Sequence, residues 1–333
     1  MHKQRLLIIG CGDIALRAAK MLQGRYRFFG LIRDAKNAPE LRALGITPLV
    51  GDLDQRATLS RLSGIAELVL HTAPPPAKGQ KDSRTFNLLS SLGKGRMVAQ
   101  RSFDNRVVMQ QQNVGTLRLA PRHKTALQGR GKGRSCRRLV YISTSGVYGN
   151  CNGELVPETR PVNPQSARAM RRVDAEQQLR RWGRRNGVSV QLLRAPGIYA
   201  QDRLPLQRLQ SATPVLQAGD DSYTNHIHAD DLARIAMMGF RRGRPGRAYN
   251  AADNSHLKMG DYFDLLADHL GLPRPPRVTK AVARTQLPAN LLSFMEESRR
   301  LTNERVYKEL RLTLNYPTVQ SALQTIASSK AKT

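Results

Sequence analysis

The stretch RLLIIGCGDIALRAAKML, residues 5–22, decides the fold class. Four consecutive apolar residues form a strand-like run that ends at Gly10, and residues 14–22 continue with the spacing of an amphipathic helix. Between them, Gly10, Gly12 and Ala15 have the spacing G-x-G-x-x-A. The first glycine permits a tight turn, the second lets a phosphate approach the backbone, and the small third residue lets the helix pack closely. This stretch predicts that a dinucleotide binds at the N-terminus of the helix.

Strand-like and helix-like segments alternate beyond this turn. The expected strands are 26–32, 47–50, 66–71, 138–143 and 188–193. The expected helices between them are 39–44, 58–62, 82–92 and 168–183. Such alternation predicts an α/β fold, a doubly wound parallel Rossmann sheet with helices on both faces.

The alternation loosens after residue 200. A helix is expected after 225, a short strand at 248–250, and helices at 258–270 and 287–310. We therefore expect a cofactor-binding Rossmann domain from residues 1–199 and 223–252. The smaller, mainly C-terminal substrate lobe would comprise residues 200–222 and 253–325.

One segment interrupts the Rossmann pattern. Residues 94–138 contain 12 basic residues and a single acid, Asp104, and have no sustained hydrophobic period. Long segments of this kind within a compact domain are usually functional or disordered. We expect a basic, mobile insertion.

The chain has a net charge of +29, and 41 of its 54 basic residues are arginine. Such a charge attracts nucleic acid nonspecifically, so nucleic acid stays open as a partner. It is not favoured, because aromatic residues make up only 5% and no zinc-finger spacing occurs.

The remaining bulk features concern location and metals. The three cysteines have neither metal-site nor redox-pair spacing, which favours a reducing, cytoplasmic location and no metal site. No apolar run approaches the ~18 residues that span a membrane. We expect a soluble protein with a small-molecule substrate, and the sequence leaves its oligomeric state open.

The end of the second expected strand bears on the choice of cofactor. An acid there accepts the 2'-hydroxyl of the adenine ribose, whereas an arginine pairs with a 2'-phosphate. Counting from Ala15 reaches Arg33, which favours NADP, but a shift of one residue would place Asp34 there and favour NAD. Asp52 follows the third strand, where it could bind the adenine amino group or only cap a turn.

Five later segments carry a family resemblance. In chain order they are YISTSGVYG (141–149), LLRAPGIY (192–199), NHIHADDLA (225–233), YNAAD (249–253) and NERVYKEL with YPT (303–318). Together they resemble the extended short-chain dehydrogenase/reductase family, which includes sugar-nucleotide epimerases and dehydratases. The resemblance covers nearly the whole chain apart from the insertion.

The resemblance implies roles for particular residues. Thr144 takes the position of the family's catalytic hydroxyl, and Tyr148 is a phenol close to the expected cleft. His71 and Ala73, at the end of the fourth strand, and Pro196, after the sixth, would lie beside the cofactor. Packing alone could also explain His71 and Tyr148.

The chain departs from the family at its usual Tyr-x-x-x-Lys pair. In NPQSARAMRRVDAE, residues 163–176, alignment on Pro164 and Glu176 places Arg168 in the tyrosine position and Arg172 in the lysine position. Arginine stays protonated near neutral pH and cannot exchange the proton that the phenol exchanges. Arg172 could still hold the nicotinamide ribose, and Arg168 could bind an anionic substrate or face solvent.

This departure resembles an atypical branch of the family. We expect an NAD(P)-dependent oxidoreductase or epimerase that acts on a small carbonyl, hydroxyl or sugar-nucleotide substrate. The alternative is a nonenzymatic, cofactor-binding regulator or scaffold whose basic insertion contacts nucleic acid or an acidic partner.

Overall fold

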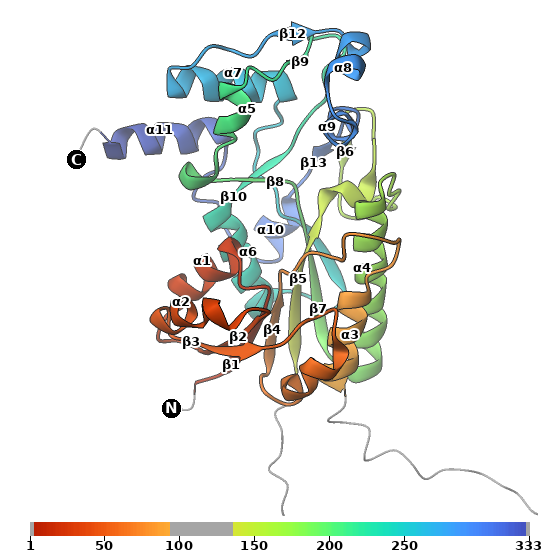
Figure 1. Ribbon diagram of the computed structural model, residues 1–333, viewed down its shortest axis with the longest axis vertical. Helices are drawn as coiled ribbons and strands as arrows, with labels where there is room; N and C mark the ends of the chain where they lie inside the picture. The colour runs from red at the N-terminus through yellow and green to blue at the C-terminus, as the bar shows by residue number, and fades with distance from the viewer. Residues whose placement is uncertain (1–2, 94–135, 331–333) are drawn as a thin grey trace, which may run out of the picture.

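A computed structural model describes residues 3–93 and 136–330 (Figure 1). Residues 94–135 lie outside the described residues. They hold nearly all of the expected insertion, so its predicted mobility stays a prediction.

A seven-stranded sheet forms the centre of the molecule, with strand order β11-β7-β5-β4-β1-β2-β3. All neighbouring strands are parallel, which confirms the predicted Rossmann sheet. The strands are β1 (Arg5–Ile9), β2 (Arg27–Ile32), β3 (Ile46–Val50), β4 (Leu68–His71), β5 (Arg138–Thr144), β7 (Ser189–Ala195) and β11 (Arg247–Asn250).

Helices cover both faces of the sheet (Figure 1). On one side lie α1 (Asp13–Met21), α2 (Ala38–Ala43) and α6 (Ala229–Arg242). The other side carries the 3-10 helix η2 (Arg56–Leu62), α3 (Ser83–Leu92) and α4 (Ala167–Asn186).

Alternate side chains of each strand enter the two cores. In β1, Leu6 and Ile8 are buried in one cluster, while Leu7 and Ile9 are buried in the cluster on the opposite face. A strand covered on both faces needs apolar residues at every position, which explains the uninterrupted run Leu6–Ile9. The C-terminal ends of the parallel strands therefore meet at one edge, where ligands bind in such folds.

A third cluster of buried residues, separate from the sheet, joins α5, β9, α7, α8, α9 and α11. These elements are α5 (Leu206–Gln210), β9 (Val215–Leu216), α7 (Met259–Leu270), α8 (Lys280–Gln286), α9 (Ala289–Met295) and α11 (Val319–Lys330). The short strand β12 (Arg277–Val278) pairs with β9. Two short parallel pairs connect this part to the sheet: β8 (Gly197–Tyr199) with β10 (His226–His228), and β6 (Leu155–Val156) with β13 (Arg300–Leu301).

The single helix expected over 287–310 is wrong. The structure divides this stretch into α9, β13 and α10 (Glu304–Lys308). Between α9 and β13, the carbonyl of Ser298 accepts the backbone N–H groups of Cys151 and Gly153 at 2.9 and 3.1 Å. Tertiary hydrogen bonds of this kind override a local helix preference. The two helices α8 and α11 were not expected from the sequence.

Candidate functional site

Two cavities lie at the C-terminal edge of the sheet. The first, here called the turn cavity, has a volume of about 300 Å³ and adjoins Gly10, Arg33, Asp34, Asp52 and Ala73. The second, here called the arginine cavity, measures about 410 Å³; it is lined by Thr144, Pro196, Arg168, Arg172 and Arg299 among others. The neighbouring residues Thr72 and Ala73 line one cavity each, so the two cavities are adjacent.

The glycine turn has the shape that a dinucleotide phosphate requires. Gly10 has φ +89°, and a Cβ atom there would lie 2.6 Å from the backbone nitrogen of Ala73, so only glycine fits. A Cβ atom on Gly12 would meet nothing within 4 Å, which leaves open space in front of α1. Gly12 is the N-cap of α1 and gives the helix no side-chain cap. The amides of the first turn are therefore available to an anion.

An acidic residue, Asp13, also lies in this first turn. Its carboxylate is bound by Arg17 and Arg203, each at 2.7 Å. Arg17 also binds Asp202 at 2.5 Å and Asp230 at 2.9 Å. Asp13 thus belongs to a network of two arginines and three aspartates beside the turn.

The turn cavity presents charges of both signs where the adenine ribose is expected. One carboxylate oxygen of Asp34 accepts the backbone N–H of Lys36 at 2.9 Å, and Asp52 likewise accepts that of Asp54 at 2.9 Å. Both acids therefore cap local turns. The exposed Arg33 lines the same cavity, and no described residue accepts a hydrogen bond from it.

Two further cofactor candidates, Ala15 and His71, line neither the turn cavity nor the arginine cavity. Ala15 is fully buried, where its small side chain allows α1 to pack on the sheet. His71 is 1% exposed, and its Nε2 lies 3.1 Å from the hydroxyl of Thr85. Burial lowers the pKa of His71 to about 3, so the imidazole is neutral. His71 does not line either cavity.

Thr144 and Pro196 lie on the arginine cavity, at the ends of β5 and β7. The hydroxyl oxygen of Thr144 accepts the backbone N–H of Gly146 at 3.2 Å, because Thr144 caps the 3-10 helix η4 (Ser145–Tyr148). No described residue accepts its proton. Thr144 can therefore donate a hydrogen bond to a substrate oxygen.

Arg172 and Arg168 project from the first turns of α4 into the same cavity. Nη1 of Arg172 donates to the hydroxyl of Tyr141 at 2.8 Å and to the carbonyl of Ile142 at 3.0 Å, which fixes its guanidinium at the end of β5. The guanidinium carbon of Arg168 lies 4.2 Å from the centre of the Phe294 ring. Arg168 is an exposed residue, and the partial burial of its guanidinium lowers its pKa, while Glu297 acts in the opposite direction.

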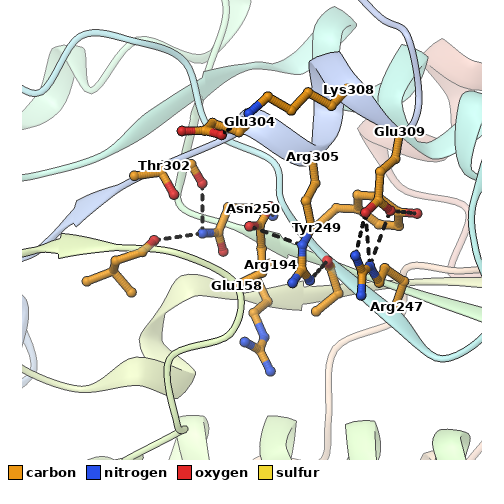
Figure 2. Close-up of polar contacts among 12 residues, drawn as sticks. Glu158, Arg194, Arg247, Tyr249, Asn250, Thr302, Glu304, Arg305, Lys308 and Glu309 are labelled. Carbon is orange, nitrogen blue, oxygen red and sulfur yellow. Dashed lines mark hydrogen bonds and ion pairs between the residues drawn. The ribbon is translucent and has the colours of Figure 1, made fainter.

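Tyr148 does not reach the cavity. It is 1% exposed; its hydroxyl accepts from Arg194 and donates to Oδ1 of Asn250, both at 2.8 Å. Asn250 in turn donates to the carbonyls of Val156 and Thr302 (Figure 2). Burial also raises the pKa of the Tyr148 phenol. These contacts hold the Tyr148 hydroxyl between β7 and β11, away from the arginine cavity.

Sequence reasoning did not propose most of the lining residues, among them the aromatic or charged residues Tyr223, Phe294, Glu297 and Arg299. Three of them lie in the stretch that was expected to be one helix, and no local pattern indicates that it turns back to the sheet. Arg299 is 8% exposed, and its Nη1 donates to the carbonyl of Gly149 at 2.7 Å and to Glu297 at 2.8 Å. The sequence EESRR, residues 296–300, does not indicate that Glu297 and Arg299 form an ion pair.

The described residues contain no group of three or more His, Cys, Asp or Glu side chains that could hold a metal ion. Nor is any helix within residues 3–93 and 136–330 both long and apolar enough to cross a membrane.

The sheet order, the glycine turn and the two cavities at the strand ends define a Rossmann-type fold. The model of the NAD dependent epimerase/dehydratase family matches residues 98–252. This match covers slightly less than half of the 333 residues, and over that part the chain is similar to the family.

Individual proteins are similar to the chain in sequence or in fold. A putative UDP-glucose 4-epimerase from Methanocaldococcus jannaschii is 20% identical over 146 residues, which are 40% of this chain and 47% of that protein. The chain thus matches less than half of this curated relative. A functionally unknown conserved protein from Silicibacter pomeroyi has a structure with a TM-score of 0.73 and 26% identity, covering 99% of this chain and 100% of that one.

A third similar protein has ligands in its structure. The dTDP-glucose 4,6-dehydratase of Streptomyces venezuelae was solved with NAD and TYD bound. Its TM-score is 0.68 at 17% identity, with 98% of each chain covered. At this identity the likeness shows the fold.

Proposed function

We propose that the chain is an NAD(P)-linked oxidoreductase or epimerase of an atypical branch of its family. Its substrate would be a small carbonyl or hydroxyl compound or a sugar nucleotide. The observation that carries this proposal is the open glycine turn at Gly10 and Gly12, with one cavity on each side of it. A bound nicotinamide would supply the hydride acceptor or donor at the arginine cavity.

The residues of this chain would divide the remaining work. Gly12 and the α1 amides would bind the phosphates, and Pro196 and Ala73 would shape the walls. Thr144 would hydrogen-bond the reacting oxygen, and Arg172 would orient the sugar of the cofactor. We also propose that residues 1–199 and 223–252 form the cofactor-binding domain, and that residues 200–222 and 253–325 form the substrate lobe.

We favour NADP over NAD. Asp34 already serves as a local cap, whereas Arg33 lines the turn cavity without a hydrogen-bond acceptor among the described residues. A free guanidinium suits a 2'-phosphate.

The three cysteines are all within the described residues and all unpaired, which supports a reducing, cytoplasmic location.

Calorimetric titration with NADPH and NADH tests this proposal. Gly12→Glu places a carboxylate in the phosphate path and should abolish binding, while the circular dichroism spectrum stays that of the parent. Arg33→Gln should weaken NADPH at least about tenfold and leave NADH within about twofold, because a lost charge-assisted hydrogen bond costs roughly 1.5–3 kcal/mol. Arg56→Gln is the control for the lost charge.

Unchanged NADPH affinity in Gly12→Glu would refute the cofactor site. If the cofactor binds tightly but a panel of carbonyl substrates never oxidises it, the nonenzymatic regulator is the better reading.

A further inference from the structure

The arginine cavity carries an excess of positive charge. Three guanidinium groups line it, from Arg168, Arg172 and Arg299, and Glu297 is the one carboxylate among its described lining residues. Glu297 is already bound to Arg299 at 2.8 Å. Two positive charges are therefore left without a carboxylate partner at the cavity wall.

The surroundings of Arg168 orient its guanidinium and leave it free. It stacks over the Phe294 ring at 4.2 Å, and no described residue accepts a hydrogen bond from it. The N–H groups of a guanidinium lie in its plane, so stacking on an aromatic face engages none of them. Arg168 therefore presents a fixed edge of donors to the cavity.

The neighbouring arginine leaves donors free as well. Arg172 uses only Nη1 in its bonds to Tyr141 and Ile142. Its Nε and Nη2 groups have no acceptor among the described residues. Donors from two arginines on successive turns of α4 can thus converge on one group of oxygen atoms.

This cluster is separate from the expected site of the dinucleotide phosphates. Those phosphates would lie at the N-terminus of α1, whose Ile14 also lines the arginine cavity, whereas Arg168 and Arg172 come from α4 on the opposite side of the sheet (Figure 1). The charge of the arginine cavity is therefore available for a second anionic group. That group has to enter with the substrate.

We propose that Arg168, with Phe294 as a stacking platform, binds an oxyanion of the substrate, either a carboxylate or a phosphate, next to the Arg172 that would hold the cofactor sugar. Arg168 thus binds substrate at the position where the resemblance expects a proton-exchanging phenol. This inference rests on the proposed function, because it names the class of substrate for the same cavity.

Calorimetric titrations with sodium acetate and with inorganic phosphate test the proposal and separate the two oxyanions. Ionic strength is held constant with chloride, since a protein with a net charge of +29 attracts anions nonspecifically. One of the two probes should bind with a stoichiometry of one. Arg168→Gln should weaken it about tenfold or more, because a charge-assisted hydrogen bond is lost.

Arg181→Gln is the matched control. Arg181 is an exposed residue of the same helix, does not line the arginine cavity, and its loss removes the same charge. Its anion affinity should stay within about twofold of the parent. Phe294→Ala removes the platform without changing charge and should weaken the anion about threefold or more.

Equal weakening in Arg168→Gln and Arg181→Gln would overturn the proposal, as would no saturable binding of either probe. NADPH affinity is measured in the same preparations and should stay within about threefold in Arg168→Gln. If the parent protein does not bind NADPH, the proposed function is refuted. The result of the anion titrations would still stand.

Discussion

Tyr223 carries the single phenol among the described residues that line the arginine cavity. Its ring packs against Arg300, whose guanidinium carbon lies 4.8 Å from the ring centre, so the ring is held in place. Because Arg168 and Arg172 cannot exchange a proton near neutral pH, another group must do so in any hydride-transfer reaction here.

We therefore predict that Tyr223→Phe lowers kcat by about 10²- to 10⁴-fold, the usual contribution of a positioned general acid. NADPH affinity should stay unchanged, because the turn cavity is not altered. Steady-state kinetics on any carbonyl substrate that turns over provides the measurement. Tyr26→Phe, outside both cavities, is the control, and an equal kcat in the two variants would contradict the role.

At the same scale, motif spacing predicted some positions well. Alignment on Pro164 and Glu176 placed Arg168 and Arg172 in the tyrosine and lysine positions of the family motif, and both line the arginine cavity. The phenol of Tyr148 was harder to place, because its partners lie elsewhere in the chain: Asn250 is 102 positions away. Local spacing predicts the helix or strand on which a residue lies. It does not predict which distant residue forms a hydrogen bond with the end of its side chain.

Among the elements, β7 and α4 are joined by a buried ion pair. Nη2 of Arg194 lies 2.8 Å from the carboxylate of Glu176, and each side chain is 5% exposed. Ser143 donates to the same carboxylate at 2.7 Å. Removing one member of a buried pair leaves the other charge without compensation.

We predict that Arg194→Met lowers the free energy of unfolding by about 3–5 kcal/mol. Urea denaturation followed by circular dichroism provides the measurement. The solvent-exposed pair Arg160–Glu154 supplies the control, because solvent screens it and Arg160→Met should cost much less than Arg194→Met. If the two variants lose similar free energies of unfolding, the buried pair contributes no more to stability than the exposed pair, and the prediction is wrong.

Elements with a regular hydrophobic period were predictable, and those fixed by tertiary contacts were not. The β1 run of buried residues and the α1 spacing gave the correct sheet and its first helix. The 287–310 stretch has a similar apolar content, yet hydrogen bonds between Ser298 and the Cys151–Gly153 loop break it into short pieces. Such bonds join residues far apart in sequence and leave no periodic trace.

For the molecule as a whole, one buried acid should set a pH dependence of stability. Asp253 is 4% exposed, and burial raises its pKa to about 7. In the unfolded chain an aspartate titrates near about 3.9. Between about pH 4 and pH 7 the folded state binds the additional proton, so the free energy of unfolding falls as the pH rises through this window.

We predict that Asp253→Asn removes this dependence. Relative to the parent, its free energy of unfolding should increase by up to about 1.4 kcal/mol for each pH unit within the window. Urea denaturation at pH 5 and pH 7 measures the difference. Asp268 is exposed, and Arg274 holds its pKa below the usual value, so Asp268→Asn should not gain stability as the pH rises. A parallel shift of both variants would contradict the assignment.

The contacts between the 149–156 and 298–302 segments have a consequence for the order in which the chain folds. Arg299 donates to the carbonyl of Gly149 across 150 positions of sequence, and β6 pairs with β13 over a similar separation. Closing so long a loop costs entropy before any contact offsets it, whereas neighbouring strands of the sheet pair over separations of 18 to 70 positions. We therefore expect the sheet to form the folding nucleus and this docking to follow the rate-limiting step. The wall of the arginine cavity that carries Glu297 and Arg299 would then be the last part of the site to assemble, and the first to open when the protein unfolds.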